Sequence, residues 1–356
     1  MAALDTSATL TELTMAICDI ESVSGNESKL ADEIEAVLAS CNHLSVTRDG
    51  NAIVASTNQG LDRVLIAGHI DTVPVADNLP TELHHFEREQ VIFGRGTVDM
   101  KAGVALMLKL AVEITNPIVD VSWIFYDNEE VDSHLNGLGR LSRNNPELLV
   151  GSFAVLCEPT SAMVEGGCNG TIRIELKATG KKAHSARPWM GKNAIHELLP
   201  ALQILKDYEP AVVNVDGLDY KESLNAVRAN AGIATNVIPD SATLMINYRF
   251  APDKSATEAE QLLREWFEGY EIEVVDAAEG ARPGLNTELA AAFINATGAS
   301  VNPKYGWTDV ARFSSLGIPA VNYGPGDPSL AHADNENVPV GQIHDCYEGL
   351  KGWLSN

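Results

Sequence analysis

Histidine and acidic side chains stand beside five apolar stretches of this sequence. In chain order they are His69 with Asp71, then Asp99, the pair Glu129 and Glu130, then Glu158 and His332. Four of the stretches, residues 63–68, 121–126, 153–157 and 318–323, have the composition of buried strands. In a mostly parallel sheet, ligands bind beyond the carboxyl ends of the strands. We therefore expect these side chains to share one rim of such a sheet and to form a metal centre there.

The donor atoms of this set are imidazole nitrogens and carboxylate oxygens, which favours a zinc-type site without thiolates. The set is larger than one ion needs, and two ions about 3.5–4 Å apart that share a bridging carboxylate fit it better. Asp71 is suited to accept a hydrogen bond from the second ring nitrogen of His69 and so to orient that ligand. Adjacent carboxylates such as Glu129 and Glu130 repel each other unless a cation compensates. One of the pair can therefore bind metal while the other handles a proton.

Each of these residues, taken alone, has an ordinary structural explanation. Asp99 precedes a helix expected over Met100–Ile114, and aspartate is a preferred N-cap residue. The histidine–aspartate pair could lie on the surface, and the two adjacent glutamates could belong to a solvated loop. A loop position alone would also explain Glu158 or His332. The metal hypothesis therefore rests on their joint occurrence.

Length and charge narrow the class of protein. At 356 residues the chain can hold two domains, each with its own core. A formal net charge of -24 argues against nucleic acid or an anionic membrane as a partner. No apolar run reaches the length of a transmembrane helix, and Met1–Leu10 lacks the features of a secretory signal. The five cysteines form no CxxC pair, which favours a reducing, cytoplasmic setting and small buried apolar roles for the thiols.

Apolar periodicity divides the chain into an outer part and an insertion. Residues 1–169 and 284–356 are expected to form an α/β catalytic domain, a mostly parallel mixed sheet flanked by helices. Residues 170–283 change to half-exposed alternating strands, in the order β-α-β-β-α-β of a ferredoxin-like layer. Strands are expected there at 171–178, 223–231, 242–250 and 270–277, and helices at 192–208 and 255–267. In the outer part we expect a hairpin over 45–56 and helices at 10–19, 29–40, 100–114, 136–144, 286–297, 310–315 and 340–354.

Four motifs resemble those of the M20 metallopeptidases, a family that includes aminoacylases, carboxypeptidases and desuccinylases. They are residues 68–71 (GHID), 94–103 (GRGTVDMKAG), 127–130 (DNEE) and 158–159 (EP). The resemblance covers nearly the whole chain, including the insertion. It implies a zinc-peptidase-like catalytic domain with two zinc ions per chain, for which Co²⁺ can substitute. It also implies a cis peptide bond between Asp99 and Met100.

The resemblance further implies a role for each residue of the metal centre. The ligand sets are His69, Asp99 and Glu158 for one ion, and Asp99, Glu130 and His332 for the other. Asp71 would orient His69. Glu129 would be the general base, which takes a proton from water that attacks an amide carbonyl and passes it to the leaving amine.

Two segments of the insertion, residues 183–188 (AHSARP) and 235–239 (TNVIP), match lid motifs of the same family. They imply that His184 donates a hydrogen bond to the reaction oxyanion, in dimeric members from the partner's lid, and that Asn236 contacts substrate. Arg249 would pair with a substrate carboxylate through its forked guanidinium. Because the small sheet has an edge that tends to be paired, we expect the insertion to be both a lid and a homodimer interface.

Residues 184–191 and 324–336 carry a closer resemblance to desuccinylases of the actinobacterial type. This implies a small N-acyl amino-acid substrate, N-succinyl-LL-2,6-diaminopimelate, and products succinate and LL-diaminopimelate, in lysine biosynthesis. The Arg-rich stretch expected after residues 165–167 is replaced by Cys168–Thr171. Candidates for binding the succinyl carboxylate are Arg249, Arg187 and the backbone of Gly324. The alternatives are another amide hydrolase of the family (an acetylornithine deacetylase, aminoacylase or dipeptidase) or a metal-free homologue that has lost catalysis.

Overall fold

The computed structural model describes residues 4–86 and 89–355. Residues 1–3, which begin the segment expected to lack a secretory signal, lie outside the described part. The chain forms two compact units. The first comprises residues 1–166, 284–302 and 312–356, and the second comprises residues 167–283 and 303–311.

The second unit differs from the predicted insertion, residues 170–283, mainly by taking residues 303–311, which we expected in the catalytic part. Hydrogen bonds explain this assignment. The amide of Asn169 donates to the carbonyl of Lys304 at 3.2 Å, and Trp307 Nε1 donates to the carbonyl of Glu279 at 3.1 Å. Such a short loop carries no apolar periodicity, so the sequence gives no signal for its return to the second unit.

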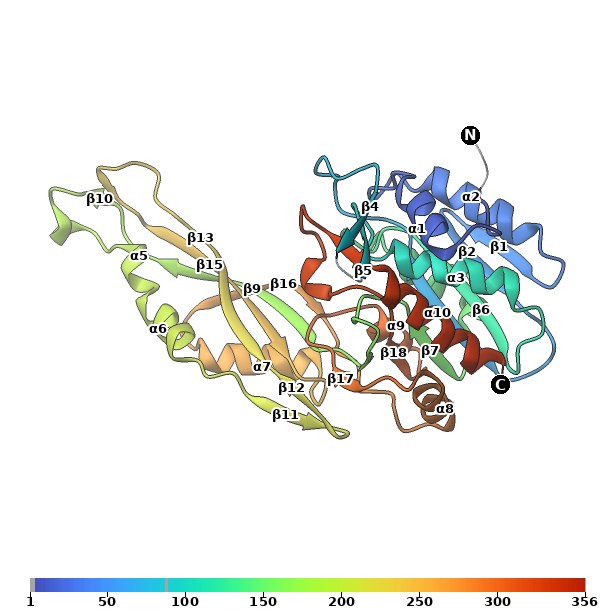
Figure 1. Cartoon of the computed structure of the whole chain (residues 1–356). Coiled ribbons are helices and arrows are strands. Elements are labelled where there is room, and N and C mark those ends of the chain that lie inside the picture. Colours follow the sequence, from blue (N-terminus) through green and yellow to red (C-terminus); the bar gives the residue numbers. More distant parts are fainter. Residues whose placement is uncertain (1–3, 87–88, 356) are drawn as a thin grey trace. The chain divides into compact units, whose positions relative to one another are not determined.

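A central eight-stranded sheet organises the first unit (Figure 1). Its strand order is β1-β2-β6-β3-β7-β18-β8-β17. The bounds are β1 (Ser45–Asp49), β2 (Ala52–Ser56), β3 (Arg63–His69), β6 (Asp120–Tyr126), β7 (Phe153–Leu156), β8 (Val164–Gly166), β17 (Val301–Pro303) and β18 (Ala320–Asn322). At the centre, β3 pairs parallel with β6 and with β7, and β7 pairs parallel with β18. The predicted α/β fold with a mixed central sheet is confirmed, and its parallel strands are the ones that lead to the candidate ligands.

Helices flank this sheet close to the predicted ranges. They are α1 (Leu10–Cys18), α2 (Ser28–Ala39), α3 (Lys101–Glu113), α4 (Gly137–Asn144), α8 (Glu288–Thr297), α9 (Val310–Ser315) and α10 (Val340–Ser355), with short 3-10 turns at Pro146–Leu149 and Pro328–Leu330. Among the described residues, no helix has both the length and the apolarity that crossing a lipid bilayer requires.

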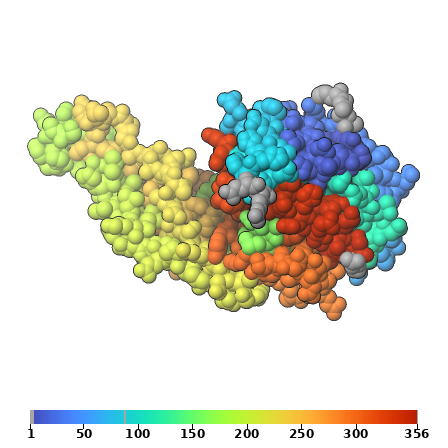
Figure 2. Space-filling view, viewed as in Figure 1, coloured from blue at the N-terminus to red at the C-terminus, as the bar shows by residue number. Residues whose placement is uncertain are grey.

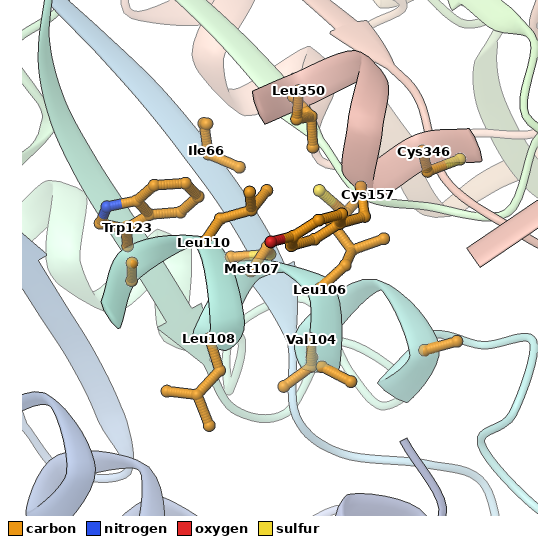
Figure 3. Packing of buried hydrophobic residues seen from close by; sticks show 14 of the residues in the cluster. Ile66, Val104, Leu106, Met107, Leu108, Leu110, Trp123, Cys157, Cys346 and Leu350 are labelled. Carbon is orange, nitrogen blue, oxygen red and sulfur yellow. The ribbon is translucent and has the colours of Figure 1, made fainter. Parts of the chain in front are cut away.

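The helix α3 lies inside the first unit, where it contacts β3, α1 and α10. Its side chains are buried on opposite faces: Leu106 and Leu110 lie on the side of Ile66, while Val104 and Leu108 point the other way (Figure 3). A helix that is covered on nearly all sides needs apolar residues nearly all round, which explains why residues 104–112 are apolar apart from Lys109. The rigid packing fixes the start of α3, directly after Asp99 and Met100.

A three-stranded sheet in the first unit was not predicted. Its order is β19-β5-β4, with bounds β4 (Glu82–Phe86), β5 (Glu89–Phe93) and β19 (Asn337–Pro339). The strand β5 leads into the Gly94–Asp99 loop, and β19 follows the loop that carries His332. Pairing of these two strands, with Asn337 opposite Phe93, therefore brings two distant candidate ligand loops together.

The second unit contains a four-stranded antiparallel sheet in the order β13-β15-β9-β16. Its elements are β9 (Gly170–Thr179), β10 (Ala183–His184), a 3-10 turn (Pro188–Met190), α5 (Ala194–Glu197), α6 (Leu199–Asp207), β11 (Val212–Val215), β12 (Leu218–Lys221), β13 (Ser223–Ala231), β14 (Val237–Ile238), β15 (Ser241–Phe250), α7 (Ala256–Trp266) and β16 (Glu271–Ala278). In sequence order the main strands run 2-3-1-4 across the sheet, which agrees with the ferredoxin-like prediction. The single helix predicted over 192–208 is wrong. It is divided into α5 and α6 because Pro200, in the first turn of α6, has no backbone N–H with which to continue a helix from α5.

Charge is divided unequally between the two units. The first holds 31 of the 49 acidic and 11 of the 25 basic residues, so its formal charge is -20, whereas that of the second is -4. The acidic character seen in the composition therefore belongs almost entirely to the unit with the candidate metal ligands.

Burial of the cysteines gives a simple test of the fold. Cys18, Cys157, Cys168 and Cys346 are buried free thiols, and only Cys41 is partly exposed. Burial raises the pKa of Cys18 to about 12 and that of Cys168 to about 11, which suppresses the reactive thiolate. We expect a thiol reagent to modify about one cysteine per native chain, and all of them after denaturation. Rapid native modification that persists in a Cys41→Ser variant would contradict this packing.

Candidate metal centre

Three neighbouring strands deliver candidate ligands to one edge of the central sheet. His69 is the last residue of β3 and stands opposite Tyr126, the last residue of β6. On the other side of β3, Ala67 stands opposite Leu156, the last residue of β7. Because these strands are parallel and in register, the residues that follow them emerge at the same rim.

The structure brings all five predicted ligands together. His69 Nε2 lies 3.1 Å from Asp99 Oδ1 and 3.9 Å from Glu158 Oε1. His332 Nε2 lies 3.4 Å from Asp99 Oδ2 and 3.0 Å from Glu130 Oε1. Two groups result whose ligand atoms all lie within 4.8 Å of one another, namely His69–Asp99–Glu158 and Asp99–Glu130–His332. The two carboxylate oxygens of Asp99 thus face one histidine each, as a bridging ligand requires.

The hydrogen bond of His69 sets the tautomer of its ring. Nδ1 lies 3.0 Å from the carbonyl oxygen of Asp71, which can only accept. Nδ1 therefore carries a proton in either protonation state of the ring, and Nε2 is the nitrogen that faces the acidic cluster and can bind metal once it has lost its own proton. This is the arrangement in which a histidine binds zinc.

Asp71 does more than the predicted orienting of His69. Its carboxylate Oδ1 lies 3.5 Å from the ring, beyond the distance of its own carbonyl oxygen. The same carboxylate accepts the amides of Glu129 at 2.9 Å and Glu130 at 3.1 Å, and the hydroxyl of Ser24 at 2.7 Å. Asp71 is fully buried, and one residue therefore fixes a ligand, the candidate base and a second ligand relative to one another.

Glu129 has the position expected of a base beside the metals. Its carboxylate belongs to a third group of possible ligand atoms, with His69 and Glu130, within 4.8 Å. The side chain is half-buried, and it is not needed to complete either of the two ligand groups described above. That it acts as the base stays a prediction, tested below.

Asp99 is not the N-cap of α3. The N-cap is Met100, and the peptide bond between Asp99 and Met100 is cis, as the resemblance implies. The Asp99 side chain faces the two histidines instead. The ordinary explanation for this residue is therefore wrong, and the residue is available to a metal.

The carboxylates of the cluster favour positively charged neighbours. Hydrogen bonds to Asp99 and Glu130 raise the pKa of His332 to about 10. Burial alone would lower the pKa of His69, but its bonds to Asp71 and Asp99 hold it well above the ordinary value. Protons and metal ions compete for such donors, and neutral imidazoles with carboxylates are a zinc-type ligand set. The residues present therefore fit divalent metal.

The strand end that carries Glu158 is crowded on both sides by glycines. A β-carbon at Gly103 or Gly324 would lie only 2.3 or 2.4 Å from the carbonyl oxygen of Cys157. Gly324 also donates its amide to Thr160 Oγ1 at 3.1 Å and accepts the amide of Thr160 at 3.2 Å. This amide is thus engaged within the fold, and close packing explains the glycine without substrate binding.

The predicted substrate residues of the second unit form two groups. His184 on β10 pairs with Val237 on β14, and the amide of Ser185 donates to the carbonyl of Asn236 at 2.9 Å. Arg187 belongs to the same turn, since its amide donates to the carbonyl of His184. In Figure 2 the light-green segment around β10 lies beside the gold segment around β14 at one end of this unit.

Arg249 is the next-to-last residue of β15 and is distant in the strand from the end that follows β14. Eight residues separate it from Ser241 at the other end of the strand, a rise of about 26 Å. Burial and the neighbouring Arg173 lower the pKa of Arg249, and its Nε donates to Asn247 Oδ1 at 3.2 Å. An arginine in such surroundings is suited to an anionic ligand.

Sequence reasoning missed two residues that support the centre. Ser24 donates to the Asp71 carboxylate, and its loop runs beside residues 70–72 through bonds such as that from the Thr72 amide to the Ser22 carbonyl. Glu336 accepts the backbone amide of Asp99 at 3.1 Å. Neither residue has a signal in local periodicity, because both act through contacts between distant loops.

Comparison with known proteins places these residues in context. The model of peptidase family M20/M25/M40 matches residues 65–356. The chain is 45% identical to the succinyl-diaminopimelate desuccinylase of Corynebacterium glutamicum, with 96% of this chain and 95% of the relative covered. It is 49% identical to a protein of Mycobacterium tuberculosis provisionally named as the same enzyme, DapE, with 96% and 97% covered.

Solved structures agree in fold. A tripeptidase from Staphylococcus aureus superposes with a TM-score of 0.78 at 21% identity, covering 99% of this chain and 98% of that one. An M20 family metallo-carboxypeptidase from Sulfolobus solfataricus superposes with a TM-score of 0.73 at 18% identity, covering 97% and 98%. These similarities extend over both units of the chain and concern the fold alone.

Proposed function

The chain belongs to peptidase family M20/M25/M40 and is a metal-dependent amidohydrolase, and from this premise we propose that it is a di-zinc succinyl-diaminopimelate desuccinylase. Its reaction would be the hydrolysis of N-succinyl-LL-2,6-diaminopimelate to succinate and LL-diaminopimelate. The observation that carries the proposal is the set of two imidazoles and three carboxylates at one sheet rim, with a further carboxylate beside it. The choice of substrate is supported by the desuccinylase names of the relatives that are 45% and 49% identical over nearly the full chain.

Zinc ions held by the two ligand groups would polarise the scissile carbonyl and acidify a water. Glu129 takes the proton of the attacking water and passes it to the leaving amine. Asp71 holds the amide next to this carboxylate, so the base keeps its place while its proton moves. The adjacent Glu130 is turned toward His332 and serves as a ligand, which divides the two roles between neighbouring carboxylates.

His184 is the proposed donor to the oxyanion. Its Nδ1 accepts the amide of Ala186 at 3.1 Å, so the neutral ring carries its proton on Nε2. The side chain is exposed, and Nε2–H is therefore a donor that a substrate can reach. An oxyanion that develops in the transition state is stabilised by such a fixed donor.

The two groups of substrate residues in the second unit lead us to propose a homodimer. A ligand as long as four extended residues spans about 14 Å, which is less than the rise of about 26 Å along β15 from Ser241, which follows the β14 partner of His184 closely in sequence, to Arg249. Both groups can serve one substrate only if they come from different chains. This supports the predicted arrangement in which the lid of one chain supplies His184 to the site of another.

An exposed surface on the second unit is suited to that pairing. The strand β13 is at the edge of its sheet, and its residues from Asn225 to Ala231 are all exposed. Val227 on this strand is 56% exposed, and Leu199 on the adjacent helix α6 is 64% exposed. An edge strand with apolar neighbours tends to be covered, and antiparallel pairing with its copy would cover it.

The cytoplasmic location stays a prediction.

A panel of matched substrates tests the proposed function. Zinc-reconstituted protein should be assayed for kcat/KM on N-succinyl-LL-diaminopimelate, on N-propionyl-LL-diaminopimelate, which lacks only the acyl carboxylate, and on Nα-succinyl-L-lysine, which lacks only the distal carboxylate. We expect kcat/KM for the first substrate to exceed that for each of the others by at least about 100-fold. The reason is that buried protein groups that bind a substrate carboxylate are left without a partner when the carboxylate is missing.

The same panel includes substrates of the alternative amide hydrolases. N-acetylornithine, N-acetyl amino acids and simple dipeptides should be poor substrates, and metal-free protein should be inactive on all of them. Faster turnover of acetylornithine or of a dipeptide would replace the proposed desuccinylase by that activity, while the metal-dependent amidohydrolase would stand.

A further inference from the structure

A buried ion pair lies beside the metal centre and is not part of either ligand group. Arg95 Nη1 lies 2.8 Å from Glu336 Oε2, and the two side chains are only 3% and 1% exposed. Burying two charges is unfavourable unless their remaining donors and acceptors are also satisfied. The guanidinium of Arg95 makes two more hydrogen bonds. Its Nε donates to the carbonyl of Pro74 at 3.1 Å, and its Nη1 donates to the carbonyl of Ala333 at 3.3 Å.

The second carboxylate oxygen of Glu336 holds the loop of the bridging ligand. Oε1 accepts the amide of Val98 at 2.9 Å and that of Asp99 at 3.1 Å. The backbone carbonyl of Glu336 accepts the amide of Gly94 at 3.0 Å. One residue thus ties both ends of the Gly94–Asp99 loop, immediately before the carboxylate that faces both histidines.

The same pair borders the loop of His332. The Glu336 amide donates to the Ala333 carbonyl at 3.2 Å, and Arg95 Nη1 donates to the same carbonyl at 3.3 Å. His332 itself has a φ of 66°, a left-handed conformation that a non-glycine residue keeps only where its surroundings enforce it. The bonds at Ala333 are positioned to enforce it.

Two of the three ligands of the first group, His69 and Glu158, depend on other contacts, whereas the shared ligand Asp99 and His332 of the second group do not. His69 is held in the ladder between β6 and β7, and Glu158 follows β7 directly. Asp99 and His332, in contrast, both belong to loops that meet at Glu336. We propose that Arg95 and Glu336 are positioning residues that preorganise the Asp99–Glu130–His332 site, so that their loss weakens this second metal site more than the first. The inference rests on the proposed two-metal function.

Metal titration of Glu336→Gln tests it without relying on activity. Metal-free protein is titrated with Zn²⁺ by calorimetry and with Co²⁺ by its visible absorption. The wild type should bind about two ions per chain, as the two ligand groups require. In Glu336→Gln we expect the first affinity to change by less than about threefold and the second to fall about 10- to 100-fold, the effect typical of losing an outer hydrogen-bond partner of a ligand.

Glu222→Gln is the matched control. Glu222 is also a buried carboxylate, and it accepts from Tyr248 Oη at 2.8 Å, from the amide of Ala251 at 2.8 Å and from Lys254 Nζ at 2.6 Å. It belongs to the second unit, so its loss should lower the melting temperature while leaving both metal affinities unchanged. Equal weakening of both sites in Glu336→Gln, or none, would overturn the positioning role.

The titration also distinguishes failure of the two-metal function from failure of the Glu336→Gln variant to fold. A wild type that binds one ion only would overturn the two-metal function itself, and the inference with it. If Glu336→Gln does not fold, Arg95→Lys carries the test, since it keeps the charge but has one nitrogen in place of the Nη1 that reaches Glu336 and Ala333 and the Nε that reaches Pro74. The same selective loss of the second ion is expected there, and its absence would again overturn the proposal.

Discussion

Replacement of Glu129 by glutamine is expected to lower kcat by about 10³- to 10⁴-fold, the contribution typical of a general acid–base group that acts in both halves of a reaction. The amide side chain keeps the shape of the carboxylate but cannot take the proton of the attacking water. Metal content should stay at the wild-type level, because the two ligand groups remain complete without this residue. The measurement is kcat on the best substrate, with zinc determined in the same sample.

Asp132→Asn is the control for this experiment. It makes the same carboxylate-to-amide change three residues further along, on an exposed part of the loop. Its kcat should be within about twofold of the wild type, as expected for a surface substitution. Near-normal turnover of Glu129→Gln with both metals present would exclude the base role, and loss of zinc from that variant would make Glu129 a ligand instead.

Replacement of His184 by alanine is expected to lower kcat by about 10²- to 10³-fold, the effect of removing one oxyanion donor. The residue lies in the second unit, whereas the metal ligands lie in the first, so zinc content should not change. A fall in kcat at constant metal content would support a donor that acts in the transition state. An unchanged kcat would remove His184 from the mechanism.

Mixing two inactive variants tests whether this donor comes from a second chain. A hybrid dimer of His184→Ala and Glu129→Gln contains one site in which both residues are intact. With equal amounts and free exchange, half of the dimers are hybrids with one working site in two, so about a quarter of the wild-type activity should return. No recovery despite demonstrated subunit exchange would place His184 in its own chain's site.

A mixture of Glu129→Gln with Glu130→Gln is the matched control for complementation. Both residues belong to the same loop of one unit and are anchored by Asp71. Each site of every dimer then contains one defect, and activity should not return. Recovery in this control would show that exchange repairs sites by some route other than a shared lid.

The sequence predicted which residues of the candidate site lie together where strands end in it. The exits of β3, β6 and β7 were visible because parallel buried strands are apolar runs that stop abruptly at polar residues. Asp71, two residues past one exit, was identified by the same logic, although its shortest contact to His69 is made by the carbonyl oxygen at 3.0 Å and the carboxylate is farther away, at 3.5 Å. The ferredoxin-like order of the second unit was predictable because its strands alternate and its helices do not.

Features made by contacts between distant loops were not predictable. Glu336 reads as one more acidic loop residue, and only the fold shows it buried beneath the Asp99 backbone. The short strands β4, β5 and β19 have mixed polarity, so no period distinguishes them from loops. The division of the helix at Pro200 was missed because apolar spacing continues across it, while the missing amide interrupts the hydrogen bonds.

The unequal distribution of charge has a consequence for how substrate arrives. The proposed substrate, which carries three carboxylates, would meet the field of a first unit whose formal charge is -20, and the two proposed divalent ions would neutralise only a small part of it. The Debye length shrinks from about 30 Å at 0.01 M ionic strength to about 8 Å at 0.15 M. Added salt should therefore screen repulsion rather than attraction and speed up encounter, the reverse of electrostatic steering. At low ionic strength, the proposed substrate would therefore associate slowly with this protein.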